Sequence, residues 1–564
     1  MGEPFFTPGT PILLDRKGLG AARPGDLAVA VPGTGRARLE RVLGSSKDIE
    51  AVLEGLLVEE GARTEFEPFE VRDPSLEGRV DLRDLTTFTI DPETAKDFDD
   101  AISMRAEGDG LRAWVHIADV SYFVTAGSAL DRGAAKRAFS TYVPGRVAPM
   151  LPPELADDAC SLRPHVERLC VTVELPFDGS LELGEPAFYR SVIRSDERLS
   201  YGQAQGILRG REPMRDEIAE ALRLTDRLSA ELRRRRFARG ALRIETGEIS
   251  FEFDGHGGVA RAWRESEPQA HVLIEELMIL ANESVARLLA GRKREALYRV
   301  HERPDPQAIL LLLAKLADLE VPTPPAPEAD RLSPSAAARL AGEISERVTA
   351  SVEQTGRGRE AFPSLVLRAL KQARYDPKNL GHSGLASQAY CHFTSPIRRY
   401  PDLVVHRALL RELGTSDEPL PDDLQQAAEH ASLRERAAAD LEYRADDLCL
   451  AWLLDARLYE EGWETTFPGE IIGAIASGLF VRFGDVFEGY LPARRLSGDY
   501  FELNETGTAM VGRRGRSVFR LGDPIEVKVA EIRKSEGKVE LALSAPASAS
   551  PARAGGSAGR RRRG

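Results

Sequence analysis

Four aspartates lie within one short segment of the chain and could bind a divalent cation. Asp91 follows a strand-like run, and Asp97, Asp99 and Asp100 come six to nine residues later. Carboxylates this close repel one another unless a cation neutralises them. Hard oxygen ligands suit Mg²⁺, which keeps some waters and takes substrate phosphate oxygens, and two such ions can hold the attacking and leaving oxygens of a phosphodiester. The alternative is an acidic surface loop, against which the interleaved apolar residues argue.

A second segment, residues 392–403, carries the adjacent arginines Arg398 and Arg399 between two prolines, just ahead of a predicted helix. A guanidinium group makes bidentate contacts to a phosphate and can stabilise negative charge that develops on it. The alternative is an arginine–carboxylate ion pair that fixes the start of the helix. The residues alone leave both interpretations open.

Composition divides the chain into four segments, and it predicts an α+β multidomain protein. Residues 1–70 alternate short apolar runs with Gly and Pro, which indicates strands. Residues 71–460 form the main body. Residues 461–545 contain five short strand-like runs separated by glycines, a pattern typical of a small closed barrel. Residues 546–564 are rich in Ala, Ser and Gly and end in four arginines, so we expect a disordered, cationic tail.

The elements that must position the two segments follow from apolar periodicity. Strands are predicted at residues 86–90, 113–117 and 169–175, and helices at residues 47–60, 271–290, 402–413 and 420–459. The helix at 271–290 is apolar nearly all round, which indicates a buried helix. Ser266 and Gln269 are spaced as a capping box ahead of it.

The bulk properties restrict the class of protein. The net charge of −13 counts against a protein that simply coats nucleic acid, but not against an enzyme that confines positive charge to a channel. The spacing of the four cysteines matches neither a zinc site nor a redox pair, so we expect buried thiols. No run reaches the roughly 18 apolar residues of a membrane helix, and the N-terminus lacks a secretory signal. We therefore expect a cytoplasmic monomer.

Both segments resemble the signatures of the ribonuclease II/ribonuclease R family. TIDPETAKDFDDAIS (Thr89 to Ser103) is similar to its catalytic signature, and YCHFTSPIRRYPDLVVHR (Tyr390 to Arg407) to its second signature. Similar segments lie between them, so the resemblance covers about residues 70–460 in matching order. It implies a mixed α/β catalytic domain with a central RNA channel, flanked by small OB-type β-barrels, of which residues 1–70 would be a partial cold-shock-like region.

The resemblance also implies roles for individual residues. Asp91, Asp97, Asp99 and Asp100 would hold catalytic Mg²⁺, or Mn²⁺, and the attacking water, and Arg398 would stabilise the transition state at the scissile phosphate. The aspartates and Arg398 would thus be the catalytic residues.

Further residues are implied to contact RNA. Tyr142 would stack on the 3′-terminal base, although a core tyrosine is the alternative. Tyr201 and Glu276 would recognise the ribose 2′-hydroxyl, although Glu276 could instead favour the dipole at a helix N-terminus. Glu442 aligns loosely with a glutamate near the active site. Ile244 stands where the family often has a phenylalanine. An aliphatic side chain cannot stack on a base, so a looser hold on the terminal bases is expected.

Residues 467–544 resemble an S1-type RNA-binding barrel. Phe480 matches a base-stacking aromatic, with a barrel core residue as the alternative, and Lys538 matches a basic position. Ser477 replaces a second aromatic, Pro492 a usual histidine, and Arg533 a usual aspartate. The affinity of this barrel for RNA would therefore depend more on charge than on stacking.

The resemblance predicts a 3′→5′ exoribonuclease that hydrolyses single-stranded RNA to nucleoside 5′-monophosphates. A catalytically inactive RNA-binding regulator on the same scaffold is the alternative, which the intact set of four aspartates and Arg398 disfavours. A glycosidase using two of the aspartates would explain neither the arginine segment nor the S1-type barrel.

Overall fold

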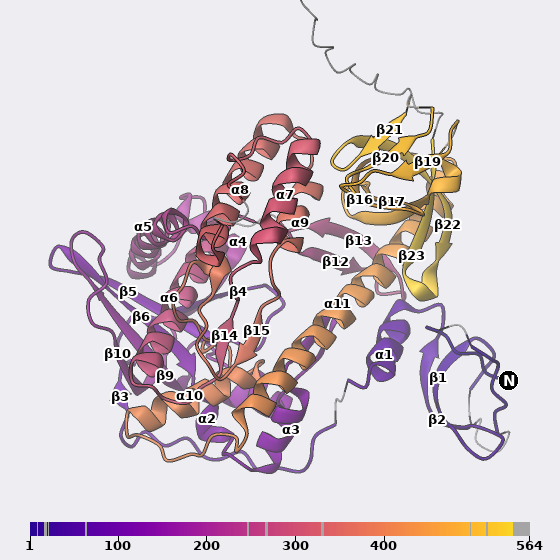
Figure 1. Ribbon diagram of the computed structural model, residues 1–564. Coiled ribbons are helices and arrows are strands. Elements are labelled where there is room, and N and C mark those ends of the chain that lie inside the picture. Colours follow the sequence, from indigo (N-terminus) through magenta and orange to yellow (C-terminus); the bar gives the residue numbers. More distant parts are fainter. Residues whose placement is uncertain are drawn as a thin grey trace, which may run out of the picture.

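The computed structural model (Figure 1) describes residues 1–7, 9–15, 20, 22–62, 65–244, 247–265, 269–328, 332–496, 498–514 and 517–544. The predicted cationic tail and the predicted cap at Ser266 lie outside the described residues. No described helix is long and apolar enough to cross a membrane. All four cysteines are buried and unbonded, as expected.

A seven-stranded sheet forms the centre of the main body, with strand order β11-β4-β5-β6-β9-β10-β3. Its strands are β3 (Val80–Asp81), β4 (Phe88–Asp91), β5 (Asp100–Glu107), β6 (Gly110–Ala118), β9 (Glu167–Phe177), β10 (Ala187–Arg194) and β11 (Glu197–Ser200). Most neighbours are antiparallel, whereas β11 with β4 and β10 with β3 are parallel. The strands predicted at residues 113–117 and 169–175 are confirmed within β6 and β9, and the strand predicted at residues 86–90 overlaps β4, which begins two residues later and ends one residue later.

Helices cover one face of this sheet. They are α4 (Tyr201–Leu208), α5 (Asp216–Ala238) and α6 (Gln269–Gly291). Their apolar side chains and those of β5, β6 and β9 form one buried cluster, because alternate residues of a strand point to the same face. The predicted buried helix is thus confirmed as α6, whose side chains are buried along most of its length.

Two helices near the end of the main body carry residues of the predicted site. They are α10 (Tyr400–Glu412) and the long helix α11 (Leu424–Glu461). Helix α11 begins later than the predicted residue 420 because the side chain of Asp423 accepts a hydrogen bond from the backbone N–H of Gln426 (2.9 Å) and caps its N-terminus. Helix α10 begins two residues earlier than predicted, with Pro401 in its first turn.

Smaller elements surround the sheet and join it to the C-terminal region. The helices are α2 (Val120–Phe123), α3 (Ala129–Arg137), α7 (Pro306–Asp318), α8 (Pro334–Thr355) and α9 (Ala361–Arg368), with a π-helical turn at Glu154–Ala159. The strands pair as β7 (Thr141–Val143) with β8 (Arg146–Ala148), β12 (Ile249–Phe253) with β13 (Val259–Arg264), and β14 (Tyr298–Val300) with β15 (Arg374–Asp376).

The predicted C-terminal barrel is confirmed. It closes in the order β16-β17-β18-β23-β22, and its strands are β16 (Thr466–Ile475), β17 (Gly478–Phe483), β18 (Phe487–Pro492), β22 (Pro524–Arg533) and β23 (Lys538–Leu543). A small three-stranded sheet of β19 (Phe501–Leu503), β20 (Ala509–Gly512) and β21 (Val518–Arg520) is inserted between β18 and β22. Figure 1 shows the barrel beside α7 and α9, beyond the C-terminal end of α11.

The N-terminal region is simpler than a barrel. Its described residues form the antiparallel pair β1 (Asp26–Val31) and β2 (Arg38–Ser45), followed by α1 (Ile49–Glu59), which confirms the helix predicted at 47–60. Helix α1 packs against α11 through a small apolar cluster, while β1 and β2 lie on the outer side of the molecule (Figure 1). The two strands make a ribbon rather than a closed barrel within the described part of this region.

Candidate active site

The four aspartates lie around one loop at the edge of the central sheet. Asp91 is the last residue of β4 and Asp100 is the first residue of β5. These strands pair side by side in antiparallel fashion, with Phe88 opposite Ile102. The connecting loop, which carries Asp97 and Asp99, therefore brings all four residues to the same end of the sheet.

Asp99 joins this loop to the arginine segment. Its side chain is buried, with 3% of the residue exposed. One carboxylate oxygen accepts a hydrogen bond from the backbone N–H of Ile397 (2.8 Å), and the other accepts one from Nε of Arg398 (3.3 Å). Burial raises the pKa of Asp99 well above its usual range, although the charge of Arg398 opposes this. Two segments about 300 residues apart in sequence thus meet at one carboxylate.

The two adjacent arginines have different partners. Arg399 pairs with Asp402 in the first turn of α10 through Nε and Nη2 (3.0 and 2.8 Å), so it fixes the start of that helix. Arg398 contacts Asp99 and donates from Nη2 to Oγ of Ser395 (3.2 Å), while 45% of its side chain is exposed. The helix-start interpretation therefore holds for Arg399, and Arg398 retains N–H groups that can face a phosphate.

Asp91 and Asp100 form a pair of carboxyl groups whose loss of solvation is only partly offset by nearby arginines, Arg198 at Asp91 and Arg398 at Asp100. Oδ2 of Asp91 is buried and has no hydrogen-bond partner. Burial, followed by the charge of Asp100, raises the pKa of Asp91 to about 7, and burial raises the pKa of Asp100 to about 6. Neither carboxyl group is fully ionised at neutral pH until a cation offsets the loss of solvation.

The residues fit a divalent cation that uses few protein ligands. Across the described residues, no three side chains of His, Cys, Asp or Glu are placed closely enough to hold a metal ion. Mg²⁺ commonly uses one or two carboxylates and completes its shell with water and substrate phosphate oxygens. The unpartnered oxygen of Asp91 next to Asp100 is the kind of donor that such an ion requires.

Tyr142, on β7, contacts the aspartate loop. Its hydroxyl donates to Oδ2 of Asp97 (2.7 Å), and its backbone N–H donates to Oε1 of Glu442 on α11 (2.7 Å). The residue is 37% exposed, so it is not a core tyrosine. Glu442, which sequence alone aligned only loosely, therefore lies at the site and fixes the backbone of β7.

Tyr201 also lies near Asp91 and Asp100, at the start of α4. It is the first residue of α4, which begins with a capping box formed by Ser200 and Gln203. The parallel pairing of β11 with β4 sets Ser200 opposite Asp91. Burial and the charges of Asp100 and Asp91 raise the pKa of Tyr201, whose ring lies 5.1 Å from that of His271. Tyr201 therefore stays a neutral hydroxyl beside the aspartates.

The other predicted RNA-contact residues make their contacts elsewhere. Glu276 on α6 is buried and accepts hydrogen bonds from Nε and Nη2 of Arg236 on α5 (3.1 and 2.5 Å). Ile244 is half-buried and packs against the apolar cluster shared by α7, α8, α9 and the barrel. Phe480 lies on β17, and Lys538 on β23 donates to Glu536 (2.9 Å).

Arg198 on β11 is a site residue that sequence reasoning missed. Its Nη2 donates to the backbone carbonyl of Pro92 in the aspartate loop, and its guanidinium lies over the ring of Phe98, 5.6 Å from the ring centre. Its charge also lowers the pKa of Asp91. An isolated arginine in a short strand carries no signal of this kind, because the pairing of β11 with β4 is visible only in the fold.

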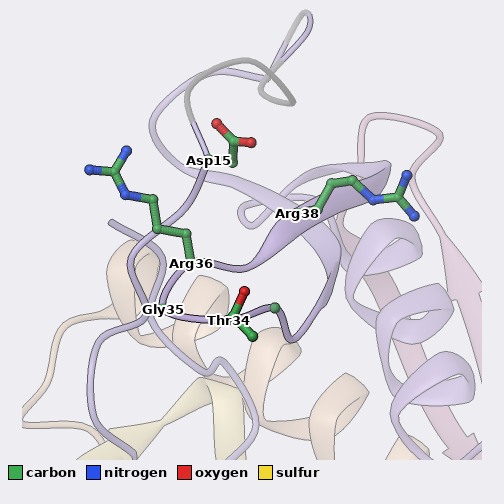
Figure 2. A pocket seen from close by; sticks show the side chains of 6 residues that line it. Asp15, Thr34, Gly35, Arg36 and Arg38 are labelled. Atoms are coloured by element: carbon green, nitrogen blue, oxygen red, sulfur yellow. The ribbon is translucent and has the colours of Figure 1, made fainter.

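A surface hollow of about 500 Å³ in the N-terminal region is separate from this site. It is lined by Asp15, Arg36, Arg38 and the turn at residues 33–35. Figure 2 shows Arg36 and Arg38 extending away from each other, so their charges do not converge on one ligand. None of the predicted site residues lines this hollow.

Comparisons with known proteins agree with the fold and the motifs. The profile of the RNB domain matches residues 79–415. The chain is 37% identical over 492 residues to Ribonuclease R of Escherichia coli strain K12, which covers 84% of this chain and 58% of that protein. The chain thus spans less than two thirds of that relative's length.

Two solved structures share the fold. Mycoplasma genitalium RNase R in complex with ribose methylated single-stranded RNA is 28% identical, with a TM-score of 0.81, covering 90% of this chain and 80% of that one. The same protein in complex with double-stranded RNA gives 26% identity and a TM-score of 0.79, covering 94% and 91%. Both signature segments lie within the residues that match the RNB domain. This chain therefore belongs to the family of proteins with an RNB domain.

Proposed function

We propose that this chain is a divalent-metal-dependent 3′→5′ exoribonuclease that hydrolyses single-stranded RNA to nucleoside 5′-monophosphates. The observation that carries the proposal is the contact of Asp99 with Ile397 and Arg398, in the same loop region as Asp91, whose Oδ2 has no hydrogen-bond partner. Acidic metal ligands and a guanidinium group at one point can together stabilise the negative charge that develops in phosphodiester hydrolysis. The names of the similar proteins and their RNA complexes support the substrate class.

The aspartates and Arg398 would have different roles in the reaction. Asp91 and Asp100 would hold Mg²⁺ or Mn²⁺ directly, and Asp97 and Asp99 would help to hold it through waters that the ion keeps. The ion would neutralise phosphate charge and make water a better nucleophile. Arg398 would donate to the phosphate oxygens as negative charge develops on them. Its contact with Asp99 keeps the guanidinium beside the aspartate loop rather than free in solvent.

Other residues would place the RNA. Tyr142 would stack on the terminal base, since its partly exposed ring is fixed by Asp97 and Glu442. The hydroxyl of Tyr201 would face the ribose, and Glu276 would assist it once its carboxylate turns from Arg236. Ile244 would pack against the bases without stacking, and Phe480 and Lys538 would hold RNA that has not yet entered the main body.

We also propose the wider organisation. Residues 71–460 would be the catalytic domain, with a central channel for single-stranded RNA. Residues 1–70 would be a partial OB region, 461–545 the RNA-binding barrel, and 546–564 a basic tail. The protein would act as a monomer in the cytoplasm.

Incubation of the full chain with 3′-overhang and single-stranded RNA, labelled at the 5′ end, tests the proposal. With Mg²⁺ we expect stepwise shortening to a short limit product, and EDTA should stop it. Asp99→Asn should abolish cleavage and retain RNA binding. RNA binding by the wild-type chain without any cleavage would favour the inactive regulator instead.

A further inference from the structure

The hairpin of β7 and β8 has two faces with different surroundings. In its register, Tyr142 lies opposite Val147, and Val143 lies opposite Arg146. Residues that are paired across two strands share a face, and neighbours along a strand point to opposite faces. Tyr142 and Val147 are 37% and 48% exposed, whereas Val143 and Ala148 are buried. One face therefore presents Tyr142, while the other packs into the molecule.

The buried face of this hairpin packs against the N-terminal region. Val143 and Ala148 belong to the apolar cluster that also contains Leu27 of β1 and both Val52 and Leu56 of α1. Val52 and Leu56 are one helical turn apart, so they lie on the same side of α1. Burial of apolar surface therefore joins the β7–β8 hairpin to α1.

The hairpin of β12 and β13 contacts both of these elements. Gly145, in the turn between β7 and β8, has a φ of +73°, and a Cβ atom there would approach the ring of Phe253 on β12 to 3.2 Å. Between β12 and β13, the backbone carbonyl of Gly257 accepts a hydrogen bond from the backbone N–H of Ile49 (3.0 Å), the first residue of α1. The two hairpins and α1 thus contact one another in pairs.

An ion-pair network joins α1 to the hairpin that carries Tyr142. Arg146 on β8 donates from Nη1 to Oε2 of Glu54 (3.1 Å), and its Nη2 lies 3.6 Å from Oε2 of Glu50, one turn earlier on α1. The other oxygen of Glu54 accepts from Nη2 of Arg41 on β2 (3.0 Å). Only 21% of the Glu54 side chain is exposed. Glu54 therefore links strand β2 of the N-terminal region to strand β8.

We propose that Glu54 and Arg146 are positioning residues through which the N-terminal region holds Tyr142 in place for the terminal base of RNA. The inference rests on the proposed function, and it gives residues 1–70 a role beyond any contact of their own with RNA. Asp97 and Glu442 fix the hydroxyl and the backbone N–H of Tyr142, whereas the network fixes the strand pair behind it. A ring that is already held loses less conformational entropy when a base stacks on it.

Hydrogen exchange of the free protein tests the positioning, because it requires neither RNA nor metal. Arg146→Met and Glu54→Gln should each speed amide exchange of residues 141–148 roughly three-fold, since each removes a partly exposed ion-pair contact. The double variant should exchange no faster than Arg146→Met alone, because the two residues act as one unit. Arg146→Lys should restore most of the protection. The matched control is Arg223→Met, which removes an exposed pair with Glu220 on α5.

RNA with 2-aminopurine as its 3′-terminal base reports the effect on stacking. In EDTA and at saturating protein, we expect the wild-type chain to quench its fluorescence and Tyr142→Leu to abolish the quenching. Arg146→Met should lose part of the quenching with little change in melting temperature, and Arg146→Lys should regain it. A change in packing alone, without displacement of the ring, would leave the quenching as it is in the wild-type chain.

The two measurements separate this inference from the proposed function. Unchanged exchange of residues 141–148 in Arg146→Met would overturn the inference, whatever the chain does to RNA. Wild-type quenching in Arg146→Met, or quenching that survives Tyr142→Leu, would overturn it as well, because the network would then not hold the ring that meets the base. If Arg146→Met shows both expected effects while the wild-type chain never cleaves RNA, the inference stands and the nuclease proposal alone fails.

Discussion

At the scale of single residues, the site depends on which charges have partners. Asp99 has two donors, and Arg399 has a carboxylate of its own, but Asp91 and Asp100 share a buried place with no donor at Oδ2 of Asp91. Desolvation favours the protonated form of such groups. A cation would therefore stabilise the ionised forms of Asp91 and Asp100 more than that of Asp99, whose carboxylate already accepts two hydrogen bonds.

The raised pKa values of Asp91 and Asp100 predict how stability depends on pH without divalent ions. Their unfolded pKa is about 4, whereas the folded values are about 7 and 6. The folded chain binds more protons, so stability is highest below about pH 4 for these groups and falls as pH rises through 7. Asp100→Asn should therefore raise the unfolding free energy at pH 8 by about 2 kcal/mol.

Thermal unfolding at pH 5 and pH 8 in EDTA measures this effect, with Asp440→Asn on the exposed face of α11 as the control. Mg²⁺ should stabilise the wild-type chain at pH 8 and stabilise Asp100→Asn much less. Equal stabilisation of both proteins by Mg²⁺ would show that the ion binds elsewhere.

We expect substitution of Arg398 to lower the cleavage rate and substitution of Arg399 to lower stability. Arg398→Lys should lower kcat about 100-fold with little change in melting temperature, because it removes donors that act on the developing charge. Arg399→Lys should instead lower the melting temperature, since it breaks the bidentate pair with buried Asp402. Single-turnover cleavage and thermal unfolding of both variants check this, and the reverse pattern would exchange their roles.

The side chain of Ile244 should affect the length of the limit product of RNA degradation. Its side chain is aliphatic and half-buried at the loop before β12. Ile244→Phe would add a ring that can stack on a base, so we expect a limit product of different length with an otherwise similar rate. The product ladder from end-labelled RNA measures this, with Ile244→Leu as the control. An unchanged ladder would remove Ile244 from the RNA path.

At the scale of elements, helix ends and strand pairings decide where the site residues lie. The side chain of Glu470 on β16 accepts three backbone N–H groups at the start of α9, from Arg359, Glu360 and Ala361 (3.0, 3.1 and 3.0 Å). These N–H groups have no partner within the helix. One barrel side chain therefore caps a helix of the main body.

Removing this cap should loosen the junction. We expect Glu470→Ala to lower the unfolding free energy by about 1–2 kcal/mol, and to increase proteolysis between α9 and the barrel. Glu531→Ala, on an exposed position of β22, is the control. Equal melting temperatures for the two variants would show that water replaces the cap without loss.

Local patterns predicted the elements well, and distant pairings could not be predicted. The five barrel strands are short and separated by turn residues, and α6 has an apolar pattern over its whole length, so each is visible in its own segment. That Asp99 and Arg398 belong to one site was expected only through the family resemblance, and their direct contact was not predicted. The pair of Arg236 with Glu276, and the approach of Arg198, depend on how two elements pack, which no single segment specifies.

At the scale of the whole molecule, the barrel and the main body share a core. One apolar cluster includes residues of α7, α8 and α9 together with the barrel strands. Polar contacts surround it. Arg357 pairs with Asp523 (2.9 Å), and Asp318 at the end of α7 accepts from Asn504 and Thr506 (2.9 Å each). The barrel is therefore fixed to these helices rather than attached by a free linker.

This shared core predicts that the main body does not survive removal of the barrel. A chain that ends after residue 465 would expose apolar residues of α7 and α9, such as Phe362, which is now 1% exposed. Exposed apolar surface of this kind drives association. We therefore expect the truncated chain to aggregate or to melt at a much lower temperature, as seen by size-exclusion chromatography and thermal unfolding. If it were instead monomeric and as stable as the full chain, the barrel would be an independent domain, and the shared core would contribute little to stability.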